Sequence, residues 1–316
     1  MFALLKAETL KNVETTEGVI LGVAPSNCGP TESNHQNELC GAFDGVNTTL
    51  DFLAENMAEP KRNKSSSEPG SGDFNVFKSY EEAFDTFRNH PYKLERDKNL
   101  DSKLLSPDTS GNQITYGYTG DYIDMGRYMT GEPECFGSNV YGRLVKRVRI
   151  VYSISAAYYV NKATILRKSI GISQIIDWLE SQGVRTEVIA VESSEVGHFE
   201  VTVKKFEDQF VYNDLLAVTH PEFLRRIFFR FAEYSPSWAS GYGSSIDCNK
   251  LFRKITRDVT RSPFGYMNNE HTLYMTNEDI NRGIEDVEEN IQKYKKWLGE
   301  NLPNPVETDE QIAYCL

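Results

Sequence analysis

The chain has 316 residues, of which 39% are hydrophobic and 12% aromatic, so it can bury a large core in one or two domains. It contains no apolar run of about 18 residues and no basic-then-apolar leader, so neither a membrane span nor a secretory signal is expected. The five cysteines are odd in number and lack C-x-x-C spacing. We therefore expect free thiols in a reducing cytoplasm, with a zinc site as the alternative.

The net charge of −12 is unevenly distributed along the chain. Residues 1–140 carry a net charge of −10, residues 141–263 carry +5, and residues 264–316 carry −7. A basic centre between acidic ends could attract a polyanion, or the acidic flanks could fold back and pair with the centre. We expect the second arrangement.

Residues 1–140 are predicted to form an acidic, partly irregular region that precedes a core domain over residues 141–300. Within the first region, a strand is expected at residues 19–23 and a helix at residues 49–57. Residues 59–73 contain no large apolar side chain. This composition favours a flexible stretch, because little apolar surface can be buried to offset the ordering entropy.

A short helix is expected to begin at a capping box formed by Ser79 and Glu82, and a strand is expected at residues 114–118. The next segment, residues 120–134, concentrates five charged side chains: Asp121, Asp124, Arg127, Glu132 and Glu134. Such a group could hold a cation or a basic partner. Alternatively, the segment is an irregular connection with local Asx turns and a surface Asp–Arg pair. We expect the second, since metal-ligand spacing and an EF-hand pattern are both absent.

Residues 147–206 form the centre of the predicted fold. Their periodicity predicts a strand at 149–155, a helix at 161–181, and strands at 185–192 and 198–206. A strand, a helix and a returning strand indicate a right-handed crossover in an open α/β sheet with covering helices. The last two strands are joined by a short turn, so they should pair as an antiparallel hairpin at one sheet edge.

Two more helices are expected after the central unit. Thr219 and Glu222 are expected to cap a strongly apolar helix that ends at Ser235, and its polar side carries Arg225, Arg226 and Arg230. The last helix, residues 278–298, has a heptad-like apolar stripe that favours packing on the domain over a coiled coil. Residues 301–316 are expected to form an acidic tail.

Several catalytic and binding motifs are absent from the sequence. It contains no P-loop, no complete dinucleotide glycine fingerprint, no H-E-x-x-H helix and no Gly-x-Ser-x-Gly nucleophile elbow. We therefore assign no catalytic, cofactor-binding or metal-binding residue, and no cofactor is expected.

The first central strand ends in Ser153-Ile154-Ser155-Ala156-Ala157, at the place where ligands bind in open α/β sheets. Here the chain resembles the von Willebrand factor A-like fold, in which a strand ends in D-x-S-x-S and binds a divalent ion. The resemblance covers residues 147–206, including the antiparallel third strand. Ser153 replaces the leading Asp and Ala157 the last Ser. The resemblance therefore implies the fold without its metal site, since a hard dication needs anionic oxygen ligands.

A second resemblance covers residues 75–300. Its blocks, in chain order, are GDYIDMGRYMTGEPE (120–134), RIVYSISA (149–156), IDWLESQGVRTEVI (176–189) and THPEFLRRIFF (219–229). Together they are similar to an uncharacterised tailed-bacteriophage protein family, a domain of unknown function. This resemblance implies a virus-encoded protein in an infected bacterial cytoplasm, and it implies no particular activity.

Arg143, Lys146 and Arg147 precede the first central strand, and Tyr152 lies close by in the sequence. Cations interleaved with aromatic rings suit single-stranded nucleic acid, although alternate residues of a core strand cannot all face one groove. The leading expectation is a non-enzymatic adaptor that binds a phage or host protein. The alternative is an accessory factor of phage transcription or replication that binds single-stranded nucleic acid. The candidate contacts are Arg143, Lys146, Arg147, Asp121, Asp124 and Arg127.

Overall fold

A computed structural model describes the chain over residues 10–25, 37–57, 77, 80–91, 94, 114–118, 122–139, 147–154, 162–181, 184–194, 197–220, 222–235, 259–262, 265–268, 271–276, 293, 296–297 and 300. The expected flexible stretch 59–73, most of the expected helix 278–298 and the expected tail 301–316 lie outside these ranges. Among the described residues, no helix combines the length and the apolar composition that crossing a membrane requires.

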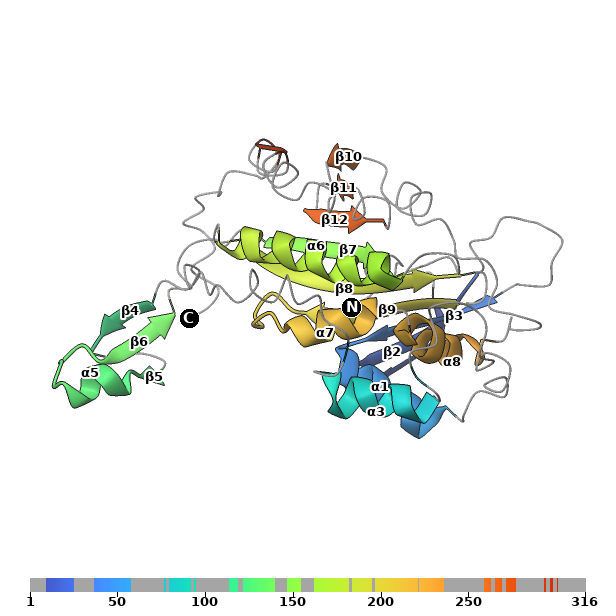
Figure 1. The fold of residues 1–316 in the computed structure, drawn as a ribbon, viewed down its shortest axis with the longest axis horizontal. Coiled ribbons are helices and arrows are strands. Elements are labelled where there is room, and N and C mark those ends of the chain that lie inside the picture. The colour runs from blue at the N-terminus through green and yellow to red at the C-terminus, as the bar shows by residue number, and fades with distance from the viewer. Residues whose placement is uncertain are drawn as a thin grey trace.

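The main body is built on a mixed sheet (Figure 1). Its strands are β1 (Lys11–Thr16), β2 (Val19–Pro25), β3 (Asn37–Phe43), β7 (Arg147–Ser153), β8 (Arg185–Ser193), β9 (Gly197–Lys204), β10 (Val259–Ser262), β11 (Gly265–Asn268) and β12 (Thr272–Met275). They lie side by side in the order β1-β2-β3-β9-β8-β7-β12-β11-β10. The sheet thus draws strands from both sides of residue 140.

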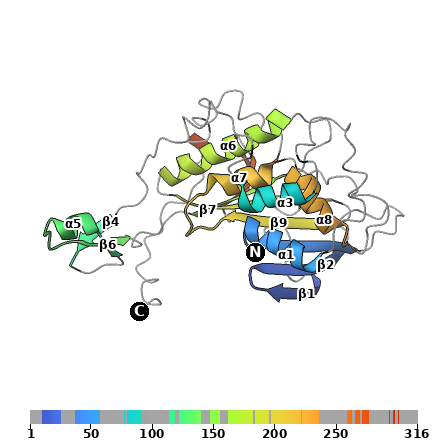
Figure 2. The same cartoon turned by 60° about the horizontal axis from the view of Figure 1, so that its bottom comes forward.

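The helices of the main body gather over one face of this sheet (Figures 1 and 2). They are α1 (Val46–Asn56), α3 (Tyr80–Asn89), α6 (Lys162–Ser181), α7 (Tyr212–Thr219), the π-helix η3 (Phe223–Phe228) and α8 (Phe229–Ala232). Their apolar sides and the facing strand residues form one buried cluster. The expected α/β class, an open sheet with covering helices, is confirmed.

The central unit follows the sequence prediction. β7 and β8 pair in parallel, with Ile150 opposite Val188, and α6 connects them. On α6 the predicted stripe is buried at Ile172, Ile176 and Leu179. β8 and β9 form the expected antiparallel hairpin, with Ser193 opposite His198.

The prediction that this hairpin lies at a sheet edge is wrong. β9 also pairs in parallel with β3, where Cys40 lies opposite His198 and Phe43 opposite Val201. The outer strand on that side is β1, which forms an antiparallel pair with β2. A hairpin pattern cannot indicate an edge by itself, because the free side of β9 can accept any strand of matching length.

The expected role of Thr219 as an N-cap is also wrong. Thr219 is the last residue of α7, and its hydroxyl donates to the Leu215 and Leu216 carbonyl oxygens. The next helix begins as η3, with Glu222 at its N-cap position. The residues before Pro221 thus end one helix and do not begin the next, as is common for residues that precede proline.

The core beside η3 is aromatic. The Phe199 ring centroid lies 5.1 Å from that of Phe43 and 5.2 Å from that of Phe231. Gly41, on the same face of β3, leaves room for these rings, since a Cβ there would lie 2.7 Å from two carbons of Phe231. The absence of a side chain at residue 41 is therefore what allows α8 to approach the sheet so closely.

Candidate partner-binding module

A small antiparallel sheet lies apart from the main body in both views (Figures 1 and 2). Its strands are β4 (Ile114–Gly117), β5 (Tyr122–Ile123) and β6 (Phe136–Asn139), in the order β4-β6-β5. The short helix α5 (Met125–Met129) connects β5 to β6. We call residues 114–118 and 122–139 the small-sheet module. It contains two predicted site residues, Asp124 and Arg127, whereas Asp121 lies outside the described residues.

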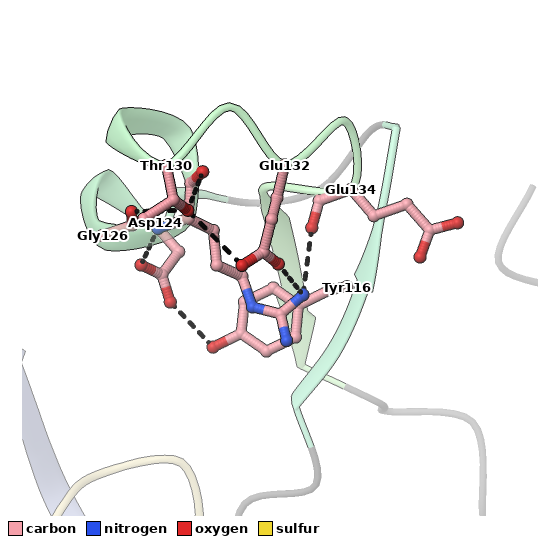
Figure 3. A network of polar contacts seen from close by, with 7 residues as sticks. Tyr116, Asp124, Gly126, Thr130, Glu132 and Glu134 are labelled. Carbon is pink, nitrogen blue, oxygen red and sulfur yellow. Dashed lines mark hydrogen bonds and ion pairs between the residues drawn. The ribbon is translucent and has the colours of Figure 1, made fainter.

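Asp124 holds the start of α5 in place (Figure 3). Its carboxylate accepts a hydrogen bond from the Arg127 backbone N–H at 3.2 Å, the geometry of an N-cap. It also accepts one from the Tyr116 hydroxyl on β4 at 2.9 Å. These two bonds, the backbone one first, lower the pKa of the Asp124 carboxyl from its usual value. Asp124 therefore joins the helix to the sheet.

The charged guanidinium of Arg127 makes its contacts within the module. Its guanidinium lies 3.8 Å from the centroid of the Tyr116 ring and forms an ion pair with Glu132 at 3.1 Å. It also donates to the Glu134 carbonyl oxygen at 3.3 Å, so the chain after α5 is tied back to the helix (Figure 3). The ion pair that the sequence suggested between Asp and Arg is thus one between Arg127 and Glu132, while Asp124 binds the Arg127 backbone.

The apolar side chains of α5 face solvent. None of its residues is buried, and Met129 has 78% of its surface exposed, the highest value among the large hydrophobic side chains of the described residues. Met125, Tyr128 and Met129 are spaced i, i+3 and i+4, so they share one side of the helix. Tyr118 and Ile123 add exposed apolar surface from the strands. Such a concentration is typical of interaction sites rather than of free protein surface.

The basic centre is only partly described, since Arg143 and Lys146 lie outside the described residues. The Arg147 side chain is 62% exposed at the start of β7, with Glu207 at 3.9 Å. Its guanidinium lies 5.3 Å from the centroid of the Phe206 ring. The next arginine of the strand, Arg149, forms an ion pair with Glu187 on β8. Arg147 therefore places an exposed cation beside an aromatic ring, with a carboxylate close by.

A hydrogen-bonded line of Ser193, His198 and Glu200 was not predicted. Ser193 Oγ lies 2.5 Å from His198 Nδ1, and His198 Nε2 lies 2.7 Å from Glu200 Oε1. This combination of groups can activate a serine as a nucleophile when substrate reaches the hydroxyl. Here all three side chains are buried on the face of the sheet opposite the helices, so the line joins β8 to β9 instead.

The sequence signal for this line is the alternation in β9. Phe199 and Val201 point toward the helices, so His198 and Glu200 must point the other way. Ser193 becomes their neighbour only once the hairpin register is known. Among the described residues, no three His, Cys, Asp or Glu side chains are grouped so that they could hold a metal ion.

Comparisons with known proteins give a family without an assigned activity. No curated protein matches the chain, and no solved structure matches it. A family model described as Domain of unknown function (DUF7192) matches residues 26–299. The expectation of an uncharacterised domain is confirmed, and the match begins well before the expected residue 75. Because this match covers most of the sequence, the chain belongs to the DUF7192 family.

Proposed function

We propose that the chain is a non-enzymatic adaptor that binds another protein through the small-sheet module, in the cytoplasm of a phage-infected bacterium. The observation that supports the proposal most is the exposed apolar side of α5, formed by Met125, Tyr128 and Met129. Methionine and tyrosine are enriched at protein interfaces. Removing each of these side chains from water would contribute about 1.5–3 kcal/mol before the losses of association.

The charges of the module favour a particular kind of partner. Arg127 is already paired with Glu132, while Glu134 is exposed and has no ion pair among the described residues. The surface around α5 therefore has an excess of negative charge. A partner that offers an apolar groove with lysine or arginine at its rim would be complementary to it.

The experiment uses the full-length protein with a photo-cross-linking amino acid at position 129, and the same amino acid at Val13 as a control. Val13 is an exposed apolar residue of β1, away from the module. The partner cross-linked from position 129 is then purified, and its affinity is measured. The double variant Tyr128→Asp, Met129→Asp should weaken binding at least about 30-fold, as expected for hot-spot residues.

Two further variants separate this proposal from a general loss of charge or fold. Val13→Asp should change the affinity less than about twofold, whereas Glu134→Lys should weaken a partner with a basic rim by about tenfold. Undiminished binding by the Tyr128/Met129 double variant, with the fold intact by circular dichroism, would overturn the proposal.

We also propose that the central sheet is von Willebrand factor A-like and that the protein is encoded by a phage. The strand arrangement supports the first of these proposals: β9 is antiparallel to β8, whereas β8 and β12 both run parallel to β7.

Ser153, at the end of β7, supplies no carboxylate. Unfolding in millimolar Mg²⁺ should therefore match unfolding in a chelator, and a stabilisation above about 1 kcal/mol would contradict this.

A second candidate function is binding of single-stranded nucleic acid, favoured by Arg147 beside Phe206. Three phosphate contacts, from Arg143, Lys146 and Arg147, would give a log–log salt slope of about −2. Replacing all three with alanine should flatten that slope. Tight, salt-sensitive binding by the intact chain would favour this function over the adaptor.

A further inference from the structure

A groove of about 570 Å³ opens between α1, α3 and α8, and none of its lining residues belongs to the small-sheet module. Its wall combines the apolar side chains of Ala54, Met57 and Phe84 with the ring of Tyr80. Arg88 and Arg230 also line it. The volume is within the range of sites that hold small organic molecules or a few residues of a peptide.

Arg230 carries a buried positive charge that has no carboxylate partner among the residues that the structure describes. The residue is only 5% exposed. Its terminal nitrogens donate to the Tyr80 hydroxyl and to the Met57 carbonyl oxygen, both neutral acceptors, and its guanidinium lies 4.7 Å from the centroid of the Tyr80 ring. Its Nε is buried and has no hydrogen-bond partner within the described part of the chain. A charge in this position is unfavourable unless an anion accompanies it.

Arg226, one turn earlier, also has a buried nitrogen, Nη1, without a hydrogen-bond partner among the described residues, but its charge is paired. Its Nε lies 2.9 Å from the carboxylate of Glu222, so its charge is neutralised within the helix. Arg230 has no such partner among the described residues. It is the second residue after the π-helix η3. π-helical turns are rare and occur frequently at functional sites.

We propose that the groove binds a carboxylate attached to an apolar side chain, with the carboxylate on Arg230 and the apolar group against Met57 and Phe84. A guanidinium matches a carboxylate in shape and in charge. The ligand can be a free organic acid or the C-terminus of a peptide chain, since both present the same chemistry. This site is independent of the adaptor surface on α5.

A phosphate group is a poorer match to this groove. Glu81 and Asp85 of α3 also line it, and Arg88 at its rim forms an ion pair with Asp51 at 2.7 Å. A dianion would meet two carboxylates for one guanidinium that has no ion pair among the described residues, whereas a single carboxylate carries half that charge. The surroundings therefore select a monoanion with an apolar body.

The experiment titrates the full-length protein, by calorimetry, with N-acetyl-leucine, its neutral amide, an octapeptide ending in a free leucine carboxylate, and inorganic phosphate. N-acetyl-leucine should bind at least about tenfold more tightly than its amide and than phosphate, which is a difference of about 1.4 kcal/mol. If the octapeptide binds more tightly still, the natural ligand is a chain terminus. Equal affinity identifies a free acid.

Arg230→Met should abolish this preference for the acid, while Arg88→Gln should change it less than about twofold, because Arg88 is already paired. If Arg230→Met fails to fold, the resonance of Arg230 Nε–H in the unaltered protein provides the test. It should shift with N-acetyl-leucine and stay unchanged with the amide. The proposal would be overturned if acid and amide bound equally or if phosphate bound more strongly. It would also be overturned if no probe bound at 10 mM, which is about the weakest affinity that would matter.

Discussion

Lys204 Nζ lies 2.8 Å from Glu180 Oε1, although the Lys204 side chain has no exposed surface and that of Glu180 is 26% exposed. The ammonium also donates to the Thr186 carbonyl oxygen at 2.9 Å. The pair therefore joins α6 to the strands with one partner in water and the other fully enclosed.

This difference predicts an asymmetry between two substitutions. Glu180→Gln should lower the free energy of unfolding by about 2–3 kcal/mol, because it leaves a buried ammonium without a counter-charge. Lys204→Met should lower it less, since Glu180 can be hydrated and methionine fills the space. Urea unfolding measures both values, and a larger effect of Lys204→Met would contradict the argument.

Asp177 should make stability depend on pH. Burial of its carboxyl, and secondarily the nearby charge of Glu180, raise the pKa of Asp177 to about 6 in the folded chain. A carboxyl whose pKa is higher in the folded state binds more protons when the chain is folded than when it is unfolded. The free energy of unfolding should therefore fall as pH rises from about 4 to about 6.

Although its carboxyl is partly buried, Asp177 as a whole residue is exposed to water, which screens its charge. We therefore expect this effect to stay below about 1 kcal/mol. Asp177→Asn should remove that part of the slope. Thermal unfolding at several pH values, with and without the substitution, measures it. If stability instead rose with pH over this range, and Asp177→Asn removed that rise, the assignment would be refuted.

Gly41→Ala should destabilise the main body by about 1–3 kcal/mol, because the new Cβ would overlap the Phe231 ring. Adding Phe231→Leu should make the alanine less harmful than it is alone, since a smaller side chain relieves the overlap. A double-mutant cycle in urea measures this coupling. Simple additivity would show that the ring is not the obstacle.

Cys40 should be unreactive in the folded protein. Burial, and next the charge of Glu38, raise the pKa of the Cys40 thiol to about 12. Because the thiolate is the nucleophile, iodoacetamide at pH 8 should leave Cys40 unmodified until the chain is unfolded in urea. Peptide mass spectrometry reports the modification. Rapid labelling under native conditions would mean that the β3–β9 region opens.

The central unit could be predicted from the sequence because its information is local. The alternation in β9 and the stripe of α6 are visible within windows of about ten to twenty residues. The pairing of β3 with β9 could not be predicted, because it joins segments far apart in the chain and leaves no mark on local periodicity. The four-residue strands β10 to β12 are too short for alternation to be distinguished from chance.

The candidate sites divide in the same way. Asp124 and Arg127 stand out in the sequence because charged residues are dense around them. The stripe of Met125, Tyr128 and Met129 is equally visible, but periodicity alone cannot tell a side that faces a core from one that faces solvent. Arg230 was expected on the polar side of its helix. Its burial depends on Met57 and Tyr80, which the sequence does not place beside it.

The parallel pairing of β3 with β9 also determines the order in which the sheet can form during synthesis. β3 ends at Phe43 and β9 begins at Gly197. About 150 residues must therefore leave the ribosome after β3 before its partner exists, which takes on the order of ten seconds or more at an elongation rate of about 5–20 residues per second. Throughout that time the nascent chain presents the unpaired side of β3, so this is the stage at which chaperone binding would do most to prevent aggregation.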